Sequence, residues 1–193
     1  LDFLDSLPKE AVNSGYGEIL KFMLIAGKQN FKGLKFIFSN LSNQRDNLHQ
    51  YIYESLNIKK VFIEEDEFDL GMRRLLNYGH TFGHALELAS DYAIAHGIAV
   101  ARGIDIVNYI ALRKEFISNS LYQAIHTIIK ENFYSDKQYG INQHVLVDNT
   151  RRDKKSSNGM LNLVFLKNPG NLFIHPIQFD SELSDILGNY LQE

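Results

Sequence analysis

Five polar side chains recur at helical spacing in the middle of this chain of 193 residues. They are Asp69, Arg73, Asn77, His80 and His84, at successive intervals of 4, 4, 3 and 4 residues. Residues three and four apart lie on the same side of an α-helix, so this spacing predicts one helix over residues 69–90 with all five on one face. Carboxylate, guanidinium, carboxamide and imidazole groups coordinate metals, orient hydroxyls and bind anions.

The other sides of this predicted helix are apolar and carry Met72, Leu75, Leu76, Phe82 and Leu86. A helix that is apolar on most sides is usually buried, and a polar face kept within it usually serves a ligand. We therefore expect the five polar side chains to lie inside the protein and to line a cavity. The glycines at 79 and 83 would let a ligand or another backbone approach closely, and tight helix packing is the simpler alternative.

Two histidines and a carboxylate make a candidate metal site. Such a set is common where zinc acts as a Lewis acid. His80 is the best first ligand, and His96 can fold back toward it across the intervening turn. Glu18 lies in an otherwise apolar segment, where a carboxylate needs a partner; a metal, Lys21 or Arg73 would serve. A hydrogen-bonded histidine pair is the alternative, and the HExxH motif of metalloproteases is absent.

A second group of residues is suited to an anion such as phosphate. Arg73 can bind an oxyanion with two parallel hydrogen bonds, and Asn77 and His84 lie on the same predicted face. The pair Lys154 and Lys155 precedes a turn at 158–159 from which a lysine can reach a neighbouring cleft. A solvated loop is the alternative for this pair. Another basic pair, Lys59 and Lys60, has the same two interpretations.

The elements that must position these residues are mostly helices. Apolar periodicity predicts helices at 8–29, 43–56, 69–90, 96–114, 118–132 and 181–191. Polar residues and glycines suggest an interruption of the first near 13–17, and Ser181 is the predicted cap of the last. Strands are predicted at 144–148, 160–166 and 172–175, the last two joined as a hairpin by a turn at 168–170. The fold class is therefore mainly α, a multi-helical domain with a small β hairpin near the C-terminus. There is no GxGxxG dinucleotide fingerprint, and the strands are too few for a nucleotide-binding sheet.

Composition excludes several classes of function. A net charge of −3 and a pI of about 6.2 argue against a nucleic-acid platform. The absence of cysteine excludes disulfides and thiolate metal sites. No apolar run approaches the ~20 residues needed to cross a bilayer, and no signal peptide is evident, so we expect a cytoplasmic protein without membrane contact. The chain begins at Leu1 and is expected to be a fragment or domain of a longer product.

At these residues the chain resembles the dehydroquinate synthases and the related sugar-phosphate cyclases. Residues 76–87, LNYGHTFGHALE, are similar to the family signature LNxGHTFGHAxE. Three weaker blocks follow the family's order: GEILKF at 17–22 resembles AEVIKY, HGIAVA at 96–101 resembles HGEAVA, and the DKK at 153–155 resembles the DKK segment before the last strands. The resemblance covers nearly all of residues 1–193 but only the family's C-terminal helical domain. It implies one metal- and substrate-binding domain, with the N-terminal NAD-binding domain absent from this chain.

The resemblance also implies roles for individual residues. It implies Glu18, His80 and His96 as ligands of Zn²⁺ or Co²⁺. It implies substrate contacts for Lys21, Lys59, Asp69, Arg73, Asn77, His84 and one or both of Lys154 and Lys155. The chain departs from the family at three positions: Asp69 replaces Glu, Tyr78 replaces Leu and Ile98 replaces Glu. These departures leave the metal triad intact and leave open which cyclase this is.

The chemistry implied by the resemblance is the conversion of 3-deoxy-arabino-heptulosonate 7-phosphate to 3-dehydroquinate and phosphate. Zinc would bind two vicinal hydroxyls of this sugar phosphate. NAD⁺, held by the missing domain, would oxidise one hydroxyl so that phosphate can leave by β-elimination. NADH would then return the hydride before ring opening and aldol closure. The active site would lie between the two domains, and a homodimer is the expected assembly.

Two alternatives remain open. The first is another sugar-phosphate cyclase, of secondary metabolism or polysaccharide synthesis, although the presence of Arg73, Asn77 and His84 favours a substrate that carries a carboxylate. The second is a non-catalytic helical domain that binds metal or pairs with another chain. The related metal-dependent alcohol dehydrogenases have a different metal-ligand spacing and fit less well.

Overall fold

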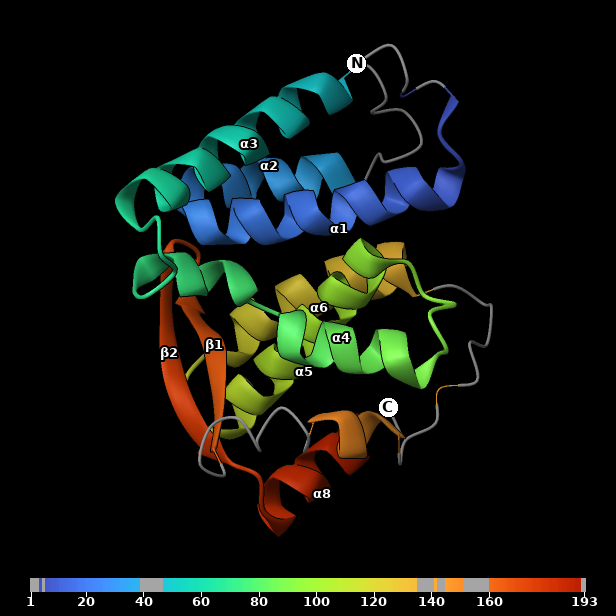
Figure 1. The fold of residues 1–193 in the computed structure, drawn as a ribbon, viewed down its shortest axis with the longest axis vertical. Helices are drawn as coiled ribbons and strands as arrows, with labels where there is room; N and C mark the ends of the chain where they lie inside the picture. Colours follow the sequence, from blue (N-terminus) through green and yellow to red (C-terminus); the bar gives the residue numbers. More distant parts are fainter. Residues whose placement is uncertain are drawn as a thin grey trace.

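A computed structural model describes residues 4, 6–38, 47–134, 141, 145–150 and 160–191 of the chain. Its elements confirm the predicted class, helices with one two-stranded antiparallel hairpin near the C-terminus. Figure 1 shows a layer of N-terminal helices above a second layer built around α5 (His96–Arg113), with the hairpin across one end. Among the helices described, none combines the length and apolar character that a membrane span requires.

The upper layer consists of α1 (Lys9–Ala26), α2 (Lys28–Phe38) and α3 (Leu48–Glu65). The suggested interruption of α1 near residues 13–17 does not occur. Gly17 is instead needed for packing, because a Cβ there would lie 2.0 Å from the carbonyl oxygen of Gly97. Segment 31–38 is the C-terminal part of α2. Helix α3 runs well beyond the predicted end at 56 and therefore includes Lys59 and Lys60.

The predicted single helix over residues 69–90 is wrong. The chain forms a 3₁₀ helix, η4 (Met72–Asn77), then a break, then α4 (His80–Ala89). Gly79 has a φ of 80°, in the left-handed region that glycine adopts without strain. Before η4, the carboxylate of Asp66 accepts hydrogen bonds from three backbone amides and so fixes a turn where a helix was expected. Burial acts to raise the pKa of Asp66, but these three bonds outweigh it and lower the pKa.

Helix α5 is the centre of the molecule and is buried on nearly all sides. Its closest neighbour is α4, which glycines allow to approach to backbone contact. A Cβ at Gly103 would lie 2.1 Å from the carbonyl oxygen of Gly79 and 2.6 Å from the amide nitrogen of Gly83. The close approach expected at Gly79 and Gly83 is therefore confirmed, and the backbone that approaches them belongs to α5.

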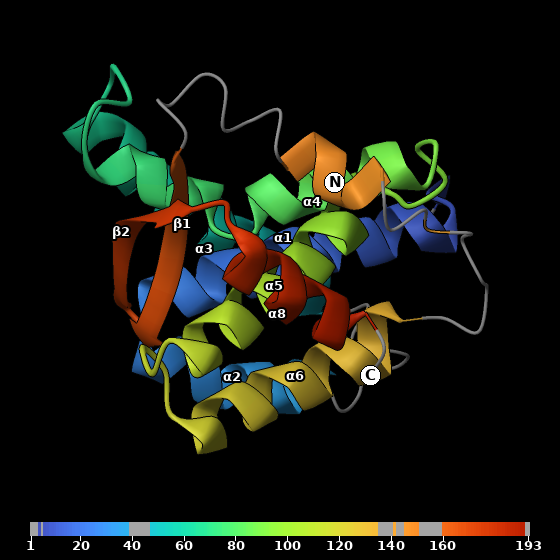
Figure 2. The same ribbon diagram turned by 90° about the horizontal axis from the view of Figure 1, so that it is seen from below.

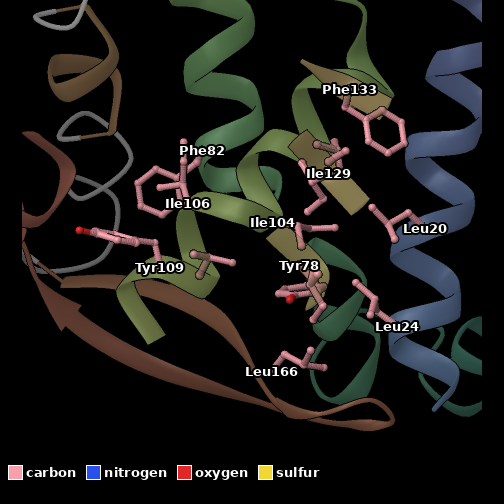
Figure 3. Packing of buried hydrophobic residues seen from close by; sticks show 14 of the residues in the cluster. Leu20, Leu24, Tyr78, Phe82, Ile104, Ile106, Tyr109, Ile129, Phe133 and Leu166 are labelled. Atoms are coloured by element: carbon pink, nitrogen blue, oxygen red, sulfur yellow. The ribbon is translucent and has the colours of Figure 1, made fainter. Parts of the chain in front are cut away.

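Apolar side chains from every layer meet around α5. Figure 3 shows Leu20 and Leu24 of α1 pointing toward Ile104 of α5 and Tyr78. Tyr78 is fully buried, and its hydroxyl donates a 2.6 Å hydrogen bond to Oδ1 of Asn108. Burial raises the pKa of Tyr78 well above its ordinary value, so this hydroxyl stays protonated.

The C-terminal third covers the remaining faces of α5. Helix α6 (Asn119–Phe133) begins at the capping side chain of Ser118, and α8 (Ser181–Tyr190) lies across α5 in Figure 2. The cap of α8 is Asp180, not Ser181 as predicted, because the Asp180 carboxylate accepts the amide hydrogen of Leu183. Residues 145–150 are helical, so the predicted strand at 144–148 is wrong over its described part, 145–148.

The hairpin was predicted correctly and ties the two layers together. Strand β1 (Met160–Asn168) pairs antiparallel with β2 (Asn171–Gln178), with Leu163 opposite His175. At its turn, the amide of Gly170 donates a 2.9 Å hydrogen bond to the carbonyl of Leu24 in α1.

Replacement of Gly103 by alanine should lower the free energy of unfolding by at least about 2 kcal/mol, because the added methyl meets backbone that cannot yield. Chemical denaturation followed by circular dichroism measures the effect. Gly188→Ala is the matched control: no atom of its surroundings lies within 4 Å of the added Cβ, and the helix should gain roughly 0.5–1 kcal/mol. Equal stabilities of the two variants would contradict the proposed backbone contact.

Candidate metal centre

Three donor side chains converge where α1, α4 and α5 meet. Glu18 lies in the middle of α1, His80 is the first residue of α4, and His96 is the first residue of α5. One ligand atom from each lies within 4.8 Å of the other two. Nε2 of His96 is 3.7 Å from Oε1 of Glu18, and the two imidazole rings are 5.5 Å apart between centroids. The structure thus brings together the three residues singled out as metal ligands.

Both histidines are inferred to direct Nε2 toward this meeting point, because Nδ1 is engaged elsewhere. Nδ1 of His80 lies 3.3 Å from the carbonyl oxygen of Tyr78, and Nδ1 of His96 lies 3.3 Å from the carboxylate of Glu87. These oxygens are acceptors only, so each Nδ1 is inferred to carry the proton. The Nε2 lone pairs are then free to coordinate, as in metal sites where the other ring nitrogen of a ligating histidine donates to an acceptor.

Glu18 uses one carboxylate oxygen and leaves the other without a hydrogen bond. Oε2 accepts a 2.8 Å ion-paired hydrogen bond from Nζ of Lys21, which settles one of the partners considered from the sequence. Oε1 is buried and has no hydrogen-bond partner among the described residues. A buried carboxylate oxygen without a partner is costly, and a cation at this point would satisfy it.

The local electrostatics favour neutral histidine at His80. Burial, and then the positive charge of Lys21, lower the pKa of His80 from 6.5 to about 4. Burial also lowers the pKa of Lys21, against the opposing effect of its ion pair with Glu18. His80 is therefore unprotonated at neutral pH, which is the form that binds metals.

The expectation that the polar side chains lie inside the protein is wrong. His80 and Arg73 are half-buried, and Asp69, Asn77 and His84 are exposed. The two helical segments are separated by the break at Gly79, so the five residues do not form one continuous stripe. Of the five, His80 and His84 lie beside His96.

The structure gives separate surroundings for His84, Arg73 and Lys59. The ring of His84 lies 5.4 Å from that of His80 and 5.8 Å from that of His96. Arg73 donates from Nη1 to the carbonyl of Glu67 at 2.8 Å. Lys59 lines, with Glu18, a cavity of about 230 Å³ between α1 and α3.

Of the three remaining predicted residues, the structure describes only Asp69. Asp69 is exposed in the turn before η4 and has a left-handed φ of 58°. Lys154 and Lys155 lie outside the described residues, so their predicted contact with a phosphate stays a prediction.

Two polar features were not anticipated. Glu87 approaches His96, and its position seven residues after His80 and three after His84 is the helical spacing that could have revealed it. The second feature is fully buried Asp105, which binds His126 at 2.9 Å and the hydroxyl of Tyr190 at 2.6 Å. It lies beside a cavity of about 340 Å³ lined by Arg102, away from the donor triad.

The same fold occurs in solved sugar-phosphate cyclases. A 2-deoxy-scyllo-inosose synthase structure matches with a TM-score of 0.76 and 21% identity, over 94% of this chain and 51% of that one. A 2-epi-5-epi-valiolone synthase, ValA from Streptomyces hygroscopicus subsp. jinggangensis 5008, solved with NAD⁺ and Zn²⁺ bound, matches with a TM-score of 0.80 and 14% identity, over 99% of this chain and 54% of that one. These likenesses establish the fold class.

Sequence comparison gives the particular family. The family model "3-dehydroquinate synthase C-terminal" matches residues 15–156, and this chain belongs to that family. The 3-dehydroquinate synthase of Clostridium perfringens (strain 13 / Type A) is 36% identical over 182 residues, 90% of this chain and 50% of the relative. That of Pelagibacter ubique (strain HTCC1062) is 33% identical over 192 residues, 94% and 51%. The chain spans about half the length of the curated relatives it matches.

Without metal, the protein should lose stability as the pH falls from about 6.5 toward about 4. In this window the unfolded chain binds a proton at His80 that the folded chain excludes, so stability is complete above the window and declines on acidification. Urea denaturation at a series of pH values measures the slope. His80→Gln should flatten it, while His49→Gln, at an exposed histidine of α3, should keep the parent's slope. The same slope in His80→Gln and parent would contradict the lowered pKa.

Proposed function

We propose that this chain is the metal- and substrate-binding half of a 3-dehydroquinate synthase, which converts 3-deoxy-arabino-heptulosonate 7-phosphate to 3-dehydroquinate and phosphate. The supporting observation is the convergence of Glu18, His80 and His96 on one open face, in a chain of this family. The relatives from C. perfringens and P. ubique carry this name.

The donor set fits a zinc or cobalt ion. A tetrahedral zinc site with nitrogen and oxygen ligands spaces its ligand atoms by about 3.3–3.5 Å. The 3.7 Å separation of Glu18 Oε1 and His96 Nε2 is close to this spacing. Oε1 of Glu18 is buried and lacks a hydrogen-bond partner among the described residues, and His80 is neutral at pH 7. Three protein ligands would leave the remaining coordination position for substrate.

When bound, the metal would supply Lewis acidity toward the substrate hydroxyls, and NAD⁺, held by the other half of the protein, would accept and return a hydride. The residues of this chain would bind and orient the substrate. Lys21 is almost fully buried and uses one N–H on Glu18, so it can direct its other donors to a substrate oxygen beside the metal.

The outer residues would hold the substrate's charged groups. Arg73 and His84 carry donors suited to a phosphate or carboxylate, and Asn77 can orient a hydroxyl. Lys59 would add positive charge from the α3 side. Lys59, Asn77 and His84 are exposed, as residues of a cleft completed by a second domain would be. Holding the substrate in a reactive geometry is the main contribution expected of these residues and of Arg73. A homodimer is part of the same proposal.

Replacement of His80 or His96 by alanine should abolish stoichiometric binding of Zn²⁺ or Co²⁺, because two of three protein ligands cannot hold the ion tightly. Isothermal titration and metal analysis after dialysis measure this. His49→Ala is the control and should bind as the parent does. Parent-like binding by either triad variant would show that the ligand set is wrong.

The reaction is tested in the longest reading frame that contains this chain, by phosphate release from 3-deoxy-arabino-heptulosonate 7-phosphate. Release should require both NAD⁺ and metal. Lys21→Met should lower kcat by roughly 100-fold or more, since it removes a buried positive charge from beside the substrate.

The possible failures of this assay have separate meanings. No release from a folded protein that binds metal would contradict the named substrate and favour another sugar-phosphate cyclase. No release and no metal binding would favour a non-catalytic domain.

A further inference from the structure

Glu87 makes a close and well-defined contact with one of the three donor residues. Both of its carboxylate oxygens lie 3.3 Å from Nδ1 of His96. The side chain of Glu87 is 14% exposed, whereas that of His96 is 47% exposed. The carboxylate is therefore the buried and fixed member of the pair, and the imidazole is the member that needs to be held.

Glu87 is also fixed through its backbone. Its carbonyl accepts hydrogen bonds from the amide of Tyr92 at 2.7 Å and from the hydroxyl of Ser90 at 3.1 Å. The same hydroxyl accepts the amide hydrogen of Ile94. These bonds shape the turn that leads from α4 into α5 and so place His96 at the start of α5. One residue thus controls both the position of His96 and the orientation of its ring.

The two carboxylates around His96 lie at opposite ring nitrogens. Glu87 lies at Nδ1 and Glu18 lies 3.7 Å from Nε2. A proton held on Nδ1 by Glu87 leaves the Nε2 lone pair directed at the meeting point with Glu18. Among the described residues, the Nδ1 contact of His80 is with the backbone carbonyl of Tyr78, whereas that of His96 is with the carboxylate of Glu87.

We propose that Glu87 is a positioning residue that fixes His96 in its Nδ1–H form, with Nε2 directed at the metal. This inference rests on the proposed metal site. The competing possibility is that Glu87 is itself a ligand, because His84, Glu87 and His96 also bring donor atoms within 4.8 Å of one another. The set of Glu18, His80 and His96 is favoured as the ligand set because it contains the buried Oε1 of Glu18, which has no hydrogen-bond partner among the described residues.

The positioning role is tested first without metal, by ¹⁵N NMR of the His96 imidazole. The comparison is made at a pH where the ring carries a single proton, and in the parent that proton should lie on Nδ1. Glu87→Ala should move the ring toward the Nε2–H form, while Glu87→Gln, whose amide oxygen can still accept from Nδ1, should largely keep the parent's form. Asp91→Asn is the control, since it removes an exposed acid from the same turn and should change nothing. An unchanged tautomer in Glu87→Ala would overturn the inference, whatever the protein does with metal.

The effect on the metal site is tested by titration with Co²⁺, followed by its absorption spectrum. Glu87→Ala should weaken binding by about 10–100-fold at unchanged stoichiometry, with partial rescue in Glu87→Gln. A parent that binds two ions and a Glu87→Ala variant that binds one would make Glu87 a ligand and overturn the inference. A parent that binds no Co²⁺ while its tautomer still depends on Glu87 would contradict the proposed function, not the contact.

Discussion

The approach of three helices to backbone contact is the constraint on which the rest of the structure depends. Gly17 of α1 meets Gly97 of α5, and Gly103 of α5 meets the turn at Gly79. No side chain larger than hydrogen fits at these crossings. The first crossing is adjacent in sequence to Glu18 and His96, and the second to His80. The glycines therefore place the three donor side chains, and the donors themselves need only local hydrogen bonds to be oriented.

The candidate site divides into a fixed part and an open part. Glu18, Lys21 and His80 are half-buried or buried and are held by ion pairing, hydrogen bonding or both. Asn77 and His84 are exposed side chains. In the proposed function, metal binding would depend on this chain alone. Tight binding of the substrate would also need the second domain that completes the cleft.

Sequence reasoning succeeded where a pattern reflects one local cause, as in the hairpin and in α5. It also named Glu18, His80 and His96 as metal-ligand candidates from their residue types, with other partners for Glu18 left open, and the resemblance to a family then implied all three as ligands. The prediction of a single helix over residues 69–90 failed because intervals of three and four residues show which side of a helix a residue would lie on but not whether the helix is interrupted. The break depends on the left-handed backbone at Gly79 and on the Asp66 side chain, which competes for the amides of the predicted helix.

The strand predicted at 144–148 failed for a different reason. Its valines favour strands, but burial of Leu146 and Thr150 in the tertiary fold favours the helix observed at 145–150. The hydroxyl of Thr150 donates to the carbonyl of Leu146, a bond that a strand could not make. The contact of Glu87 with His96 was missed because His96 lies on another helix. Helical spacing could have placed Glu87 on the same side as His80 and His84, but it could not show that contact.

Tyr78 contacts both the candidate metal site and the core, through two different atoms. Its carbonyl faces Nδ1 of His80, and its hydroxyl binds Asn108 deep in α5. Loss of either side chain of this buried pair would leave the other's polar group without its partner, a cost of roughly 1–3 kcal/mol. Positions 78 and 108 should therefore covary during evolution, with tyrosine retained where position 108 is asparagine and an apolar residue tolerated where it is not. The departure from the family's usual leucine at position 78 would then record a change in the helix core, not a change of substrate.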